Sequence, residues 1–141
     1  MKTLNLSLLT ILLLTGCASP IHQVVKEDDG PFIVGELVHD RGESNRLVLE
    51  TSNRRYEARG FAVERQTNLA ELRKRYHGVN PKHWKRIFSG LDTDHVIYSI
   101  ETIAKSAEGQ ELSCSLAWES GAKPAGVCKD QAGAELSVRF D

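Results

Sequence analysis

Three cysteines are the residues whose chemistry the sequence constrains most directly. Cys17 directly follows an apolar run, whereas Cys114 and Cys128 lie near the other end of the 141-residue chain. An odd number of cysteines cannot pair completely within one chain. One of the three is therefore either a free thiol or is consumed by other chemistry.

The apolar run before Cys17 has the features of a secretion signal. Lys2 supplies a positive charge, and Leu4 to Leu14 supply about eleven mostly apolar residues, whereas a membrane-spanning helix needs about twenty. The run ends in Leu14-Thr15-Gly16-Cys17, which resembles the lipobox of bacterial lipoproteins. That resemblance implies cleavage after a signal peptide of residues 1–16 and acylation of the Cys17 sulfur, with palmitate or similar chains.

The same resemblance implies a location for the mature chain. Two or three acyl chains on one residue are enough for stable anchoring, so the expected partner is a membrane. Ala18 and Ser19 lack the aspartate that commonly retains lipoproteins at the inner membrane. We therefore expect an outer-membrane lipoprotein facing the periplasm. The alternative is a simple secreted protein with an unpaired thiol.

With Cys17 acylated, Cys114 and Cys128 remain as an even pair in an oxidising compartment, where a disulfide is the default. If the chain turns back around Ser120 to Ala122, residues whose numbers sum to 242 face each other, and 114 and 128 satisfy that sum. Directly opposed residues in a non-hydrogen-bonded pair are close enough for a disulfide. A redox-active or metal-binding pair is the alternative, although the spacing is not C-x-x-C.

Asp92, Asp94 and His95 form the densest set of potential metal ligands. Carboxylate and imidazole groups together suit a divalent metal, but alternate strand residues point to opposite faces, which would separate Asp94 from His95. The other histidines lack metal-protease spacing, and no nucleophilic-serine or nucleotide-binding motif is present. We therefore predict no enzymatic activity, no metal site and no cofactor, and a metal-dependent enzyme is the least favoured alternative.

Charge is distributed unevenly along the chain. The segment from Arg54 to Arg86 contains ten basic and three acidic residues, for a net charge of +7, although the whole chain is close to neutral at −1. This overall balance argues against nucleic-acid binding. We define the basic patch as six residues of this segment, which could bind an anionic envelope component or an envelope protein: Arg73, Lys74, Arg75, Lys82, Lys85 and Arg86. The alternative is a solvated face balanced by acidic strands.

The elements that would position these residues are mostly strands. Alternation of period two marks strands at 111–119 and 134–141, an apolar run marks a central strand at 95–105, and shorter runs lie at 32–38, 46–51 and 55–63. Two short helices are expected at about 68–77 and 81–89, from helical spacing, a capping residue and a proline at a first helical position.

The predicted fold is mainly β (α+β), a small antiparallel curved sheet or open barrel of about seven strands with the two helices inserted. Residues 17–30 are expected to form a lipidated N-terminus and flexible tether, and residues 31–141 a single periplasmic domain. The pattern from Leu112 to Phe140 resembles the C-terminal disulfide hairpin of small uncharacterised bacterial lipoproteins and secreted proteins, which implies a small β-rich domain.

The first functional hypothesis is a non-enzymatic interaction or structural module of the cell envelope that uses the basic patch. The second is a periplasmic lipoprotein that binds a lipid or another small ligand in an interior pocket, or that inhibits an enzyme.

Overall fold

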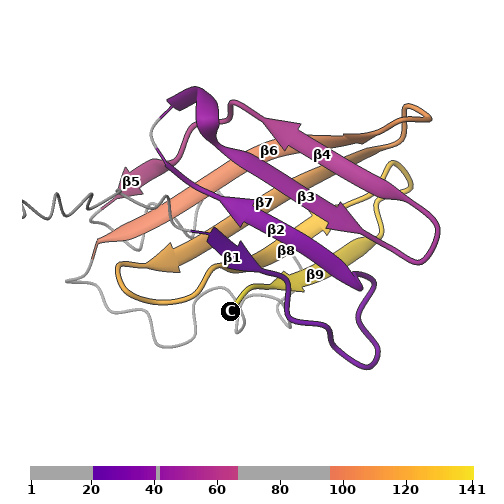
Figure 1. Ribbon diagram of the computed structural model, residues 1–141, viewed down its shortest axis with the longest axis horizontal. Coiled ribbons are helices and arrows are strands. Elements are labelled where there is room, and N and C mark those ends of the chain that lie inside the picture. Colours follow the sequence, from indigo (N-terminus) through magenta and orange to yellow (C-terminus); the bar gives the residue numbers. More distant parts are fainter. Residues whose placement is uncertain (1–20, 41, 67–95) are drawn as a thin grey trace, which may run out of the picture.

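The computed structural model describes residues 21–40, 42–66 and 96–141. In these residues the protein is mainly β, and its strands form one curled antiparallel sheet, a half-barrel (Figure 1). A short 3-10 helix, η1 (Gly42–Ser44), precedes the third strand. The strands are β1 (Ile21–Gln23), β2 (Val34–Val38), β3 (Arg46–Glu50), β4 (Arg55–Arg59), β5 (Glu64–Gln66), β6 (Ile97–Ser106), β7 (Glu111–Glu119), β8 (Ala125–Lys129) and β9 (Glu135–Arg139).

The strands follow one another around the sheet in nearly the order of the sequence. The path is β1-β2-β3-β4-β6-β7-β8-β9, and β5 pairs with β6 beside this path. The two edges of the path meet where Val24 and Phe140 form an isolated bridge. The amide of Val25 also donates a hydrogen bond of 2.8 Å to the carbonyl oxygen of Arg139. The N-terminal strand therefore contacts both β2 and the last strand of the chain.

The core lies on the concave face of this sheet. Alternate residues of β7 point inward, so that Leu112 and Leu116 are fully buried, and each faces an inward residue of β6 across the register. Leu37 on β2 and Leu47 on β3 are likewise fully buried and paired. Period-two alternation produces this arrangement because successive side chains of a strand point to opposite faces.

Most predicted strands are confirmed, with ends shifted by a few residues. The runs at 32–38, 46–51, 55–63, 95–105, 111–119 and 134–141 correspond to β2, β3, β4, β6, β7 and β9. The sheet, however, begins at Ile21 and not after Gly30, because Ile21–Gln23 pairs with β2 within the segment predicted to be a tether. Three residues are too few for an alternation to stand out, and their partners lie farther along the chain.

The two predicted helices, at about 68–77 and 81–89, lie outside the described residues. The described ranges contain no α-helix. They also contain no helix that is long and apolar enough to cross a membrane.

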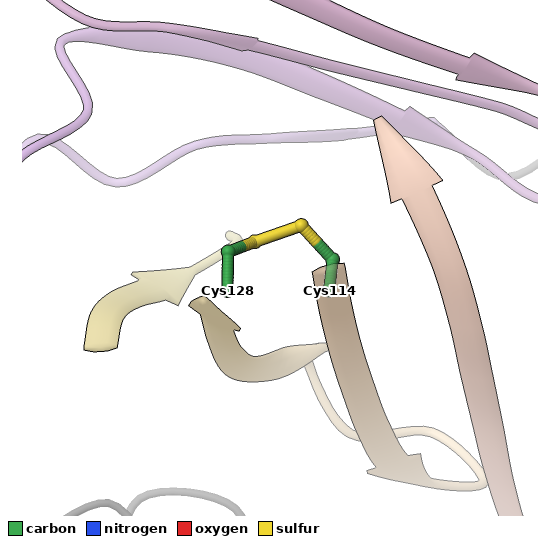
Figure 2. The surroundings of a disulfide bond; sticks show 2 residues. All are labelled: Cys114 and Cys128. Carbon is green, nitrogen blue, oxygen red and sulfur yellow. A yellow bond between two sulfur atoms is a disulfide. The ribbon is translucent and has the colours of Figure 1, made fainter. Parts of the chain in front are cut away.

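The predicted disulfide is confirmed, together with the hairpin that carries it. Cys114 and Cys128 are joined through their sulfur atoms, and their Cα atoms are 4.0 Å apart (Figure 2). The register pairs Cys114 with Cys128 and Ser113 with Lys129, as the sum of 242 requires. Gly121 occupies the turn with a φ of 83°, a conformation that favours glycine. Both sulfurs are in the core, where the cross-link fastens β7 to β8.

Candidate functional site

A cleft of about 420 Å³ lies toward one end of the half-barrel. Four ring side chains line it, His22 from β1, His39 just after β2, Tyr98 from β6 and Trp118 from β7, and the β7–β8 turn at residues 121–123 forms its rim. We call this the aromatic cleft. Its rings come from strands that are distant in sequence, and curling of the sheet brings them together.

Two histidines meet edge to edge in the aromatic cleft. The Nε2 atoms of His22 and His39 are 2.9 Å apart, and the two ring planes differ by only 12°. The Nδ1 atom of His22 lies 2.8 Å from the main-chain oxygen of Asp141. A main-chain oxygen can only accept a hydrogen bond, so His22 carries its proton on Nδ1. The Nε2 atom of His22 therefore accepts the hydrogen bond from Nε2–H of His39. In the neutral pair, His39 therefore donates a hydrogen bond to His22, and His22 donates one to Asp141.

A continuous series of rings extends from this histidine pair into the core. The ring centroids of His39 and Trp118 are 4.8 Å apart, and the planes of the two rings are inclined at 43°. Trp118 in turn lies 5.6 Å from Tyr98, with planes 25° apart. Tyr98 and Trp118 are direct partners across the β6–β7 register, which holds them side by side. Contacts of this kind are favourable beyond the area that they bury.

The environment of His39 disfavours its charged form. Burial lowers the pKa of His39 first, and the neighbouring His22 lowers it further, whereas the carboxylate of Asp40 acts in the opposite direction. Desolvation has this sign because removal of water destabilises an imidazolium more than an imidazole. Burial thus favours the neutral imidazole of His39, in which it can donate a hydrogen bond from Nε2.

Asn45 holds the loop that carries His39. Its side chain is almost fully buried, with 2% exposed. Its Oδ1 accepts a 2.8 Å hydrogen bond from the amide of Asp40, and its Nδ2 donates a 2.7 Å hydrogen bond to the carbonyl oxygen of Phe61. A buried amide with both ends satisfied ties the end of β2 to the segment after β4. Asn45 thereby positions the residue that follows His39.

None of the predicted partner-binding residues lies in the described part of the chain. The basic patch, Arg73, Lys74, Arg75, Lys82, Lys85 and Arg86, lies outside the described residues, as do Cys17 and the candidate metal ligands Asp92, Asp94 and His95. Within the described ranges, no group of three or more histidine, cysteine, aspartate or glutamate side chains is placed to hold a metal ion.

The described arginines at the start of the basic stretch are paired with glutamates. These arginines lie on or beside β4, and the glutamates lie on the same strand, on β3 or in the β6–β7 turn. The pairs are Arg54 with Glu108, Arg55 with Glu50, and Arg59 with Glu57. This part of the stretch therefore has its charge compensated locally.

Sequence reasoning missed the aromatic cleft. His22 lies in the segment predicted to be a tether, and His39 directly follows the predicted strand at 32–38. Trp118 has the inward position that the alternation of 111–119 predicts, and it is a core residue with 4% of its surface exposed. No local spacing relates these residues, because their proximity depends on sheet closure. Tyr98 belongs to the run at 95–105, which is apolar on both faces, so alternation does not predict the face on which Tyr98 lies.

In comparisons with known proteins, no family model, no curated protein sequence and no solved structure matches this chain.

Proposed function

We propose that this protein is a non-enzymatic lipoprotein of the outer membrane, facing the periplasm, whose half-barrel binds a small amphipathic molecule in the aromatic cleft. The observation that carries the proposal is the cleft itself, with four ring side chains converging on one hollow. Its volume of about 420 Å³ falls within the range of roughly 300 to 1,000 Å³ that is usual for ligand sites.

The chemistry of the cleft walls supports a ligand with both apolar and polar parts. Tyr98 presents a large, rigid, half-buried ring, and Trp118, which is buried with 4% of its surface exposed, packs against both Tyr98 and His39. The two histidines and Lys123 supply polar groups at the opening. A few directional polar groups around an apolar wall are the usual composition of a binding pocket.

Docking of an envelope partner through the basic patch stays a prediction. The pairing of Arg54, Arg55 and Arg59 with glutamates reduces the free positive charge of the described part of that stretch. Surface ion pairs of this kind contribute little binding energy of their own. Ligand binding in the aromatic cleft is therefore the function that the described geometry supports better.

Fluorescence titration with 2-naphthoate tests the proposal. Trp84→Phe leaves Trp118 as the single tryptophan of the chain, so that its emission reports on the cleft. We expect saturable quenching, and we expect Tyr98→Ala to weaken binding at least tenfold by removing one wall. Ile103→Ala is the matched control, since Ile103 lies on the same strand with 51% of its surface exposed and does not line the cleft.

Two results would contradict this proposal. One is that neither 2-naphthoate nor its neutral analogue 2-naphthamide binds saturably. The other is equal weakening by Tyr98→Ala and Ile103→Ala while both variants keep the wild-type circular dichroism spectrum, because binding would then not depend on the cleft.

A further inference from the structure

The charges around the aromatic cleft favour an anion. Among its described lining residues, Lys123 carries a permanent positive charge, and none carries a carboxylate. Two aspartates lie near the histidine pair but do not line the cleft. Asp40 adjoins His39 in sequence, and Asp141 uses its side-chain Oδ1 to accept a 2.8 Å hydrogen bond from the amide of Gln23. The described wall that faces a ligand is therefore neutral to positive.

The histidine pair can take up one proton without losing its hydrogen bond. In the neutral pair, His22 is protonated on Nδ1 and His39 on Nε2, so the one atom of His39 still free to accept a proton is Nδ1. Protonation there makes His39 a cation that still donates to His22. A second proton, on Nε2 of His22, would place two N–H groups head to head at 2.9 Å. The pair therefore stores a single positive charge.

We propose that the aromatic cleft is a site for a carboxylate-bearing molecule with a flat apolar body, and that binding of the carboxylate is coupled to uptake of one proton by the His22–His39 pair. This inference rests on the proposed function, because it names the ligand class of the same cleft. The apolar body packs against Trp118 and Tyr98, and the carboxylate lies toward Lys123 and His39.

Electrostatics explains the coupling. Burial and the adjacent His22 keep the pKa of His39 below its usual value, and Asp40 opposes them only in part. A carboxylate close to the ring favours the imidazolium and so raises that pKa. By linkage, any ligand that raises the pKa of His39 binds more tightly as the pH falls. The other charged groups near the pair are Lys123, which lines the same cleft, and Asp141, whose main-chain oxygen contacts His22.

The test compares 2-naphthoate with 2-naphthamide, which has nearly the same shape but no charge. Isothermal titration calorimetry on the full chain is done at pH 5.5 and pH 7.5, both above the pKa of about 4 that is usual for a carboxylic acid. Buffers with different ionisation enthalpies report the number of protons taken up. We expect 2-naphthoate to bind at least threefold more tightly at pH 5.5, with proton uptake, and 2-naphthamide to bind equally at both pH values.

Two variants separate the contributions. Lys123→Gln changes an exposed side chain, and we expect it to weaken 2-naphthoate about tenfold while 2-naphthamide is unaffected. His39→Gln keeps a side-chain donor, and we expect it to abolish the pH dependence and the proton uptake. Unchanged melting temperatures in both variants would show that the fold is retained.

The outcomes distinguish this inference from the proposed function. If both probes bind with equal affinity and no proton is taken up, the carboxylate inference is overturned and ligand binding stands. If Lys123→Gln weakens both probes alike, the charge recognition is overturned. If neither probe binds, the proposed function and the inference fail together.

Discussion

Reduction of the Cys114–Cys128 disulfide should destabilise the protein by about 3 kcal/mol. The two residues are 14 positions apart, and the chain-entropy account of a closed loop of about 15 residues gives this magnitude. Both residues are almost fully buried, with 1% and 0% of their surface exposed. The hairpin itself remains in the sheet without the cross-link, because β7 also pairs with β6, and β8 also pairs with β9. We therefore expect a folded but weaker protein.

Urea unfolding measures this difference. The oxidised and reduced forms are compared in a Cys17→Ser background, so that a third thiol does not enter disulfide exchange. At a typical dependence of 1 to 3 kcal/mol per molar urea, the midpoint should fall by roughly 1 to 3 M. Reduction of the wild-type bond keeps both sulfur atoms in the core, so the comparison does not include a cavity. A difference below about 1 kcal/mol would refute the entropic reasoning, since it would mean that the unfolded hairpin already holds the two strands together.

Three other predictions concern the cleft and its supports. Because the pKa of His39 is lowered in the folded protein, the unfolded chain binds more protons just below pH 6.5, so the free energy of unfolding should decrease as the pH is lowered through this range, by less than about 1.4 kcal/mol per pH unit; His39→Gln should flatten this profile in urea titrations. Gly35→Ala should loosen β1, since a Cβ would lie 2.6 Å from Cγ2 of Val24, and faster hydrogen exchange between β1 and β9 would show it. Asn45→Ala should cost about 1 to 3 kcal/mol in thermal or urea unfolding, because the carbonyl of Phe61 loses its buried donor; an unchanged stability would contradict this.

The C-terminal hairpin was predictable to single-residue register. Its strands are long, alternate regularly and are joined by a short turn, so that Cys114 could face Cys128 only if the register was the observed one. The short strands at the N-terminus carry much less information. Ile21–Gln23 contains one half-buried residue between two exposed ones, and it acquires its structure from pairing with β2 and not from its own sequence.

The aromatic cleft was not predictable for a related reason. Trp118 could be placed on the inward face of its strand, but its contact with His39 requires the sheet to curl until distant strands approach each other. Twist and coiling are properties of the whole sheet, and single-sequence periodicity does not specify their extent. Ligand sites that form at the ends of curled sheets are therefore the part of such a fold that local patterns miss.

Closure of the sheet also connects the cleft to the expected membrane anchor. His22 lies in β1, a few residues after the predicted acylation site at Cys17, and the same strand is held by the Val24–Phe140 bridge and by Asp141. A change that separates β1 from β9 would therefore remove one half of the histidine pair from the cleft. The contacts of Val24, Val25 and Asp141 with the opposite edge hold this strand in place and so keep His22 beside His39.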